Sequence, residues 1–395
     1  MYSALKKEFE QELKNILKFW STVAIDEEKG GFYGSIDNDN QPDENAVKGL
    51  VLNARILWSF AAGYNLTGDN AYLKNAERAY HYIADNFIDK EFDGAYWSVT
   101  SNGKPADTKK QIYALSFAIY AFSEYYMATK ESDALELAKS LFRDIEKHSF
   151  DDQKGGYLEA LTRDWQPIDD LRLSDKDANE KKTMNTHLHI LEAYTNLFRI
   201  WPDEFLKRQI TALIDNFTQH IVNANTNHLD LFFDEDWQVR SNIISYGHDI
   251  EASWLLLEAA EVIHDEGLIS QIKKLSVKMA EASVKGIEPN GAMNYEYEVD
   301  KNHLIAEKHW WVQAEALVGL LNAYELSGQQ HFYDAFVNVW QYIKQHIIDH
   351  KKGEWYWGRN ADGTLINEHK AGFWKCPYHN SRACIEVINR LDRIS

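Results

Sequence analysis

The chain has 395 residues, of which 42 are Lys or Arg and 61 are Asp or Glu, so its formal net charge is −19. A surface of this sign repels a phosphate backbone, which argues against nucleic-acid binding. Hydrophobic residues make up 45% of the chain, enough for a large core, yet no apolar run reaches the roughly 18 residues of a membrane span. The composition therefore favours a globular protein that binds neither nucleic acid nor membrane.

The N-terminal segment alternates charged and apolar residues and lacks the apolar stretch of a signal peptide. The two cysteines, Cys376 and Cys384, are too few for a disulfide framework. Both observations predict a cytoplasmic protein. The 13 Trp, 21 Tyr and 18 Phe residues are the first indication of function, since aromatic faces stack on sugars and on bases, and the charge argues against bases.

A short pattern recurs along the chain, in which a glycine precedes aromatic or large apolar residues in strand-like alternation. The copies begin at Gly31, Gly94, Gly156, His228 (a degenerate copy), Gly291 and Gly353. Successive starts are 63, 62, 72, 63 and 62 residues apart, and the longest interval contains a polar insertion, 167–182. The chain therefore consists of six repeats.

Each repeat predicts two helices. In the first repeat, apolar residues from Val47 to Ala61 follow helical spacing, Gly68 ends this helix, and Asp69 begins an amphipathic one that runs to Phe87. The same plan returns at 113–129 with 133–147, and at 248–264 with 268–284. The first helix of each pair is apolar nearly all round and the second has a polar face, which indicates inner and outer positions.

An opening outer helix over 2–22 and a closing inner helix over 379–391 complete six inner and six outer helices. This count predicts an all-α protein, a closed (α/α)6 barrel with short β-hairpins at one end. An open α-solenoid is the alternative, but the capping repeats of such arrays are missing from the sequence. No Pro-, Gly- or Ser-rich linker divides the chain, so we expect a single domain over residues 1–395.

Polar and aromatic residues stand near the starts of the predicted inner helices, where burial of a charge requires a reason. They are Arg55, Tyr113, Asn185 and His189, His248 and Glu251, Trp311 and Glu315, and His379 with the preceding Trp374. His187 points about 160° away from His189 on an ideal helix, so it belongs to the opposite face. In a ring, these helix ends converge on one cavity.

A lone histidine on an apolar helix is more often a core residue than a functional one. Here, polar or aromatic residues stand at the same level of the inner helices in all six repeats, and this co-occurrence predicts a site. Histidine exchanges protons near neutral pH, and tryptophan stacks on sugar faces, so we expect acid–base chemistry on a neutral sugar. A metal site of His189, His248 and Glu251 is a less favoured alternative, and no G-x-S-x-G elbow supports serine hydrolysis. We expect neither a metal ion nor a cofactor.

The segments NTHLHILEAY, SYGHDIEASWLL, KHWWVQAEAL and FWKCPYHNSRA resemble the N-acylglucosamine 2-epimerase superfamily, and most closely its cellobiose 2-epimerases. The resemblance covers nearly the whole chain and implies an (α/α)6 barrel with isomerase activity. The implied reaction is epimerisation at C2 of the reducing-end sugar of β-1,4-linked disaccharides, such as cellobiose to glucosyl-mannose or lactose to epilactose. It would proceed by ring opening and proton transfer through an enediolate.

The resemblance also implies residue roles. His248 and His379 match the pair that acts as acid and base at C2, and His189, with Asn185, matches the histidine that helps to open the ring. Arg55 matches the arginine that holds the O1/O2 side of the opened sugar. Four further residues match substrate-binding positions: Glu251, beside the first histidine, Tyr113, Trp311 and Trp374.

Several alternatives stay open at this point. Within the superfamily they are a mannose-type aldose–ketose isomerase and an N-acylglucosamine 2-epimerase. A glycoside hydrolase would use Glu251 and Glu315 as its two carboxylates but would leave three histidines unexplained. A sugar-binding module would have no use for buried histidines. The insertion 167–182 is either a mobile lid or a solvated loop. The expected partner is a disaccharide; a monomer is compatible with the sequence, which does not reveal the oligomeric state.

Overall fold

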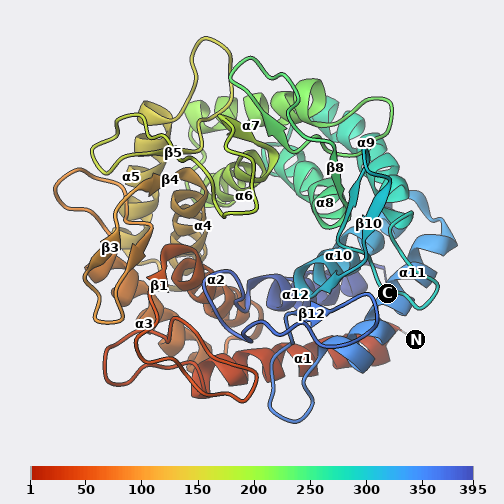
Figure 1. The fold of residues 1–395 in the computed structure, drawn as a ribbon, viewed down its shortest axis with the longest axis horizontal. Helices are drawn as coiled ribbons and strands as arrows, with labels where there is room; N and C mark the ends of the chain where they lie inside the picture. The colour runs from red at the N-terminus through yellow and green to blue at the C-terminus, as the bar shows by residue number, and fades with distance from the viewer. Residues whose placement is uncertain (1, 395) are drawn as a thin grey trace.

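The protein, described here by a computed structural model over residues 2–394, forms two concentric rings of α-helices around one axis (Figure 1). The inner ring consists of α2 (Leu50–Thr67), α4 (Ile112–Thr129), α6 (Met184–Ile200), α8 (Tyr246–Val262), α10 (Trp310–Ser327) and α12 (Tyr378–Arg393). The outer ring consists of α1 (Tyr2–Thr22), α3 (Asn70–Asn86), α5 (Ser132–His148), α7 (Glu204–Asn216), α9 (Glu266–Val284) and α11 (Gln330–Tyr342). Single π-helical turns, η1 (Phe217–Ile221) and η2 (Ile343–Ile347), extend α7 and α11.

Each inner helix contacts the next around the ring, and α12 returns to pack against α2. The barrel is therefore closed, which confirms the (α/α)6 prediction and excludes an open solenoid. Because one helix of each pair is surrounded by others, α2 is buried continuously from Leu50 to Gly63, whereas α3 buries a single face. The predicted turn between them is confirmed: Gly68 ends α2 in the left-handed region, and the Asp69 side chain accepts a hydrogen bond from the Ala71 amide.

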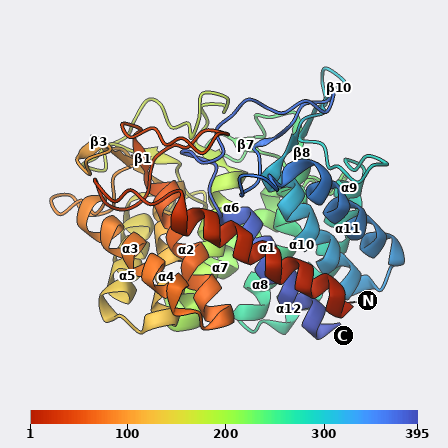
Figure 2. The same cartoon turned by 90° about the horizontal axis from the view of Figure 1, so that it is seen from below.

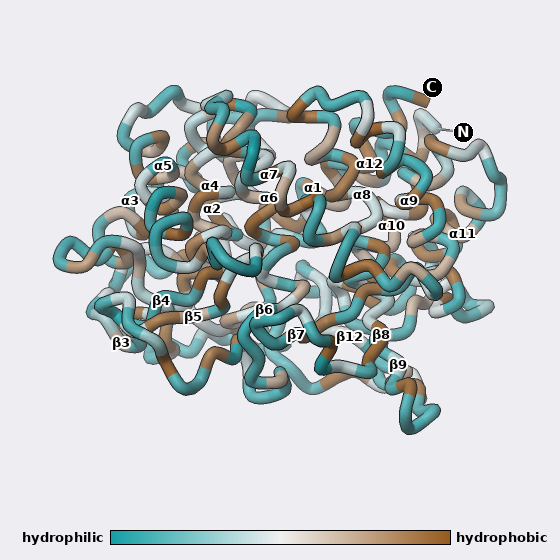
Figure 3. Tube along the Cα trace, turned by 90° about the horizontal axis from the view of Figure 1, so that it is seen from above, coloured by the Kyte–Doolittle hydropathy of each residue, from teal (hydrophilic) through white to brown (hydrophobic). Residues whose placement is uncertain are grey.

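Twelve short strands in residues 2–394 gather at one end of the barrel (Figures 2 and 3). They are β1 (Lys48–Gly49), β2 (Ser98–Val99), β3 (Pro105–Asp107), β4 (Lys110–Gln111), β5 (Ala160–Leu161), β6 (Lys182–Thr183), β7 (Phe232–Phe233), β8 (Ile243–Ser245), β9 (Glu296–Glu298), β10 (His303–Ile305), β11 (Lys308–His309) and β12 (Gly358–Arg359).

The glycine-led runs differ in detail from the predicted hairpins. Each run makes one isolated bridge to the residue six or seven positions before it, such as Tyr157 to Phe150. The strand that follows the run then pairs with the strand at the start of the preceding inner helix, as β2 does with β1 and β5 with β4. The pairing therefore links neighbouring repeats and fixes where each inner helix begins.

Ion pairs formed by buried lysines repeat with the fold. In five repeats, the lysine that precedes the inner helix binds an acidic residue just before the glycine-led run, with N–O distances of 2.7 to 2.9 Å: Lys48–Asp26, Lys110–Asp89, Lys182–Asp151, Lys308–Glu288 and Lys370–Asp349. The degenerate repeat has Asn223 at the acidic position. These pairs tie the loop to the helix start within each repeat.

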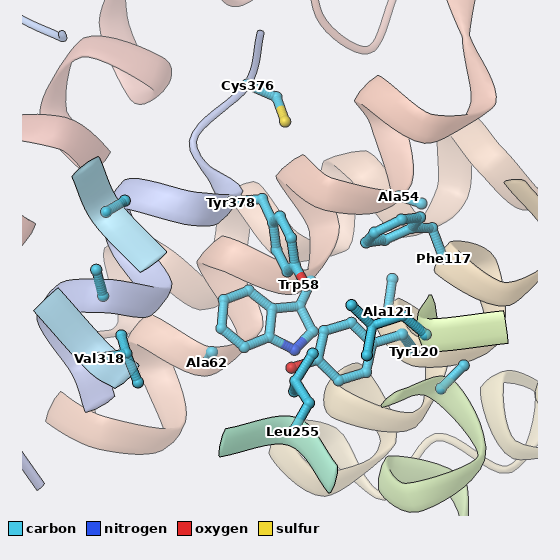
Figure 4. Close-up of a cluster of buried hydrophobic side chains, with 14 of the residues drawn as sticks. Ala54, Trp58, Ala62, Phe117, Tyr120, Ala121, Leu255, Val318, Cys376 and Tyr378 are labelled. Carbon is cyan, nitrogen blue, oxygen red and sulfur yellow. The ribbon is translucent and has the colours of Figure 1, made fainter. Parts of the chain in front are cut away.

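An aromatic layer fills the barrel interior (Figure 4). Trp58 of α2 stacks on Tyr120 of α4 at 5.2 Å between ring centroids, and Tyr378 of α12 meets Trp58 edge-on at 5.4 Å. Cys376 and Cys384 are both buried and unpaired. Within residues 2–394, no helix combines the length and the apolar composition that crossing a bilayer requires.

Candidate active site

The site residues occupy two layers at the strand-bearing end of the barrel, about one helical turn apart. The upper layer contains the second or third residue of five inner helices: Tyr113, Asn185, His248, Trp311 and His379. The lower layer contains the sixth residue of five inner helices: Arg55, Phe117, His189, Glu251 and Glu315. Since helix N-termini carry partial positive charge, the upper layer surrounds a region that favours an anion.

One wall of the site is built around Arg55, which is 3% exposed. Its guanidinium donates to the Tyr113 hydroxyl at 2.7 Å and lies 4.1 Å from the centre of the Phe117 ring. The Tyr113 ring is 5.0 Å from that of His189 and 6.1 Å from that of Trp374. Tyr113 thus contacts three other residues that were predicted from separate segments of the sequence.

The opposite wall carries His248, Trp311 and His379. The Trp311 ring lies 4.7 Å from His248 and 5.8 Å from His379. The two imidazole centroids are therefore no more than 10.5 Å apart, the sum of those distances. They come from α8 and α12 and lie beside the same indole ring.

Each of the three histidines is held through Nδ1. Glu192 contacts His189 at 2.9 Å, Ser245 contacts His248 at 2.8 Å, and Glu315 contacts His379 at 2.6 Å. Orientation through one ring nitrogen leaves Nε2 as the reactive atom, the arrangement that a proton-transferring imidazole needs.

Arg382, 1% exposed, joins the carboxylates beneath the histidines. Its guanidinium donates to Glu251 at 2.5 Å, to Glu315 at 2.6 Å and, more closely, to Glu192. Trp254 lies beneath it at 4.8 Å. One buried cation thus neutralises part of the charge of three buried carboxylates, two of which orient histidines.

Burial controls the charge of these groups. It lowers the pKa of His248 to about 3, with a further effect of His189, and it lowers the pKa of His379 well below the usual value, together with Arg55 and Arg382. Both imidazoles are therefore neutral bases at pH 7. Burial and the charge of Glu315 raise the pKa of Glu251 to about 7, and Glu251 Oε2 has no hydrogen-bond partner among the described residues.

A metal site is not favoured by this geometry. Within residues 2–394, the group of potential ligands that lie close together is Glu251, Glu315 and His379, not the set of His189, His248 and Glu251 considered from the sequence. Both carboxylates already accept hydrogen bonds from Arg382, whose cation occupies the electrostatic position that a metal ion would take.

Sequence reasoning missed four partners: Glu192, Ser245, Arg382 and Tyr378, whose hydroxyl donates to Glu192. The signal was helical spacing, because three of them lie three residues from a predicted histidine, where side chains share a face. The prediction that His187 belongs to a different face is confirmed. Its Nδ1 contacts the Thr183 carbonyl, and its Nε2 accepts from the Tyr157 amide at 2.9 Å.

The insertion 167–182 is anchored rather than fully solvated. Leu171 is buried, and its carbonyl accepts from the Gln111 side chain at 3.1 Å, next to the start of α4. The Lys109 ammonium reaches the Arg172 carbonyl at 3.3 Å. Lid motion stays a prediction.

The sequence profile of the N-acylglucosamine 2-epimerase (GlcNAc 2-epimerase) family matches residues 31–383. The chain belongs to this family. Among its relatives, a cellobiose 2-epimerase of Bacteroides fragilis is 51% identical, over 98% of this chain and 100% of its own length. A D-mannose isomerase of Marinomonas mediterranea is 24% identical, over 97% of this chain and 96% of its own.

Solved structures agree with this relationship. A cellobiose 2-epimerase from Bacillus thermoamylovorans superposes on this member of the N-acylglucosamine 2-epimerase family with a TM-score of 0.94 and 39% identity. The superposition covers 98% of this chain and 100% of that structure. The expected family and barrel are both confirmed.

Proposed function

We propose that the protein is a carbohydrate epimerase that inverts C2 of the reducing-end sugar of β-1,4-linked disaccharides, converting cellobiose to glucosyl-mannose and lactose to epilactose. The observation that carries the proposal is the pair His248 and His379, which stand on different helices, contact one tryptophan and are each fixed through Nδ1. The choice of a disaccharide rests on the 51% identity to a cellobiose 2-epimerase, against 24% to a D-mannose isomerase.

The first step is ring opening, because a closed pyranose has no acidic proton on C2. His189, paired with Glu192 at 2.9 Å, moves the proton between the anomeric hydroxyl and the ring oxygen. Asn185 assists from the turn above; its Oδ1 is buried without a partner among the described residues and accepts from a sugar hydroxyl. Tyr113, Trp311 and Trp374 supply ring faces on which the sugar packs.

The second step is proton transfer at C2. One imidazole Nε2 takes the C2 proton, and the electron pair of the C–H bond forms an enediolate. The Arg55 guanidinium, in a dry site, stabilises the charge on the O1/O2 side. Glu251 accepts from a substrate hydroxyl through its unpartnered oxygen. The other imidazole, neutral in the free site, takes up a proton from water, delivers it to the opposite face of C2 and completes the inversion.

All six inner helices pack into one closed ring, so we assign the activity to a single catalytic domain over residues 1–395. The steps above need acid–base groups only, and no cofactor is included in the proposal.

Incubation with cellobiose in D2O, followed by NMR, tests the proposal. Formation of glucosyl-mannose with deuterium at C2 is the expected result. A ketose product would instead make the protein an aldose–ketose isomerase, and free glucose would make it a hydrolase. Binding without turnover over days would indicate a sugar-binding module. Activity on N-acetylglucosamine but not on cellobiose would move the substrate to the N-acyl monosaccharides.

A further inference from the structure

Ser245 occupies a helix-capping position without capping the helix. It is the residue before α8, is fully buried and has an extended backbone with φ −110° and ψ 100°. A serine at this position normally accepts a hydrogen bond from an amide of the first turn. No such bond forms here; the hydroxyl lies 2.8 Å from Nδ1 of His248 instead.

The neighbouring inner helix shows the ordinary arrangement. Thr183 occupies the same position before α6, and its hydroxyl accepts from the Thr186 amide at 3.1 Å. Both helices carry a hydroxyl residue at the cap and a site residue in the first turn, so the local backbone offers each the same choice. At α8 the Ser245 hydroxyl contacts the His248 imidazole instead of accepting a hydrogen bond from a backbone amide of the first turn.

We propose that Ser245 is the positioning residue of His248, an assignment that rests on the proposed epimerase function. An imidazole turns readily about its Cβ–Cγ bond, and a buried partner on Nδ1 selects one orientation of the ring beside Trp311 and so fixes the direction of Nε2. The same logic governs histidines that bind metals through one nitrogen while a second group holds the other.

A hydroxyl can hold the ring in both of its working states. Nε2 takes a proton only when Nδ1 carries the hydrogen, so the Ser245 hydroxyl accepts from Nδ1–H both in the neutral ring and in the protonated ring. Glu315 holds Nδ1 of His379 in the same way, but a carboxylate also stabilises the protonated ring, which a neutral hydroxyl does far less. Ser245 therefore keeps His248 in one orientation as a base, before it takes the C2 proton, and as an acid, before it returns one.

Loss of this hold has a specific chemical consequence. An enediolate formed by His379 needs a proton from His248 on the opposite face to become the epimer. If His248 is misoriented, the proton or a solvent deuteron comes back from His379 to the original face. The starting sugar then exchanges its C2 hydrogen without inversion.

Ser245→Ala tests the assignment, with cellobiose and glucosyl-mannose as separate substrates in D2O. We expect kcat for epimerisation to fall about 10-fold to 100-fold with little change in KM. With the epimer that His379 deprotonates as substrate, the ratio of C2 exchange to inversion should rise by about the same factor, roughly 10-fold to 100-fold. From the other epimer, exchange and inversion should slow together.

Two control variants separate positioning from folding. Ser245→Thr keeps the hydroxyl and should restore the wild-type ratio of exchange to inversion. Thr183→Ala removes a true cap and should lower the melting temperature while leaving that ratio unchanged. If Ser245→Ala shows the wild-type ratio of exchange to inversion from both epimers, the assignment of Ser245 as a positioning residue is overturned. The proposed function still stands in that case, provided the wild type epimerises the sugar. If the wild type does not epimerise it, the proposed function and the assignment are both overturned.

Discussion

The buried guanidinium of Arg382 provides the most demanding test of the electrostatics beneath the site. Arg382→Met keeps a side chain of similar length and removes the cation that contacts Glu192, Glu251 and Glu315. All four side chains are about 1% exposed or less, so water cannot replace the lost contacts. The variant leaves three carboxylates in the barrel interior without their shared partner.

The magnitude follows from burial. Removing one partner of a buried ion pair typically costs about 3–5 kcal/mol, a large part of the total stability of a protein. Although burial raises the pKa of Glu192, Arg382 and His189 hold it at about 2, below the unfolded value of 4.5. In the wild type this group therefore stabilises the fold above pH 4.5, and the contribution is lost as the pH falls towards 2.

In the variant the sign reverses for Glu192. Without Arg382, burial raises the pKa of Glu192 above its unfolded value and those of Glu251 and Glu315, already raised in the wild type, still further, so the native state binds extra protons. Stability then falls as pH rises, by up to about 1.4 kcal/mol per pH unit for each titrating group. The loss relative to wild type should be smaller at pH 5 than at pH 8.

Urea unfolding at pH 5 and pH 8 measures both effects. Arg393→Met is the matched control, because Arg393 lies on the same helix and pairs with Glu325 while its own side chain is 56% exposed. We expect a loss below about 1 kcal/mol for this surface pair. A loss for Arg382→Met that equals the control, or that does not depend on pH, would refute the argument.

Three further changes test the site and its support. His248→Ala and His379→Ala should each lower kcat by about 10²–10⁴-fold with unchanged circular dichroism; near-wild-type turnover in either would contradict its role. Burial raises the pKa of Glu159 to about 8. The free energy of unfolding of the wild type should therefore fall more steeply between pH 4.5 and 8 than that of Glu159→Gln. Urea unfolding across this pH range measures the difference, and parallel profiles for the two proteins would contradict the raised pKa. At Gly156 (φ +79°) a Cβ would come within 2.4 Å of Trp237 and 2.7 Å of His187, whereas at Gly363 (φ +84°) it meets nothing within 4 Å. Gly156→Ala should therefore lower the melting temperature well beyond the effect of Gly363→Ala, which costs about 1–2 kcal/mol, and equal effects would disprove the clash.

Much of the site was predictable because the spacing of residues along a helix determines which side chains lie on the same face. His248 and Glu251, or Asn185 and His189, share a face in any α-helix, and the burial of such groups already required a function. The partners of the histidines were harder to find. Ser245 looks like an ordinary helix cap in the sequence. Arg382 lies 131 residues from Glu251 along the chain, so no local sequence pattern shows that these two side chains meet.

The amino-acid order alone determined the repeat and the helix pairs, because hydrophobic periodicity and turn residues such as Gly68 act within a few residues. Tertiary structure decided which polar groups meet. Closure of the ring by α12 places His379 beside the tryptophan that also contacts His248, and Arg382 against three carboxylates from three other helices. Such long-range contacts depend on the packing of the whole ring. The contacts in turn set the tautomers and charges of the histidines, on which proton transfer depends.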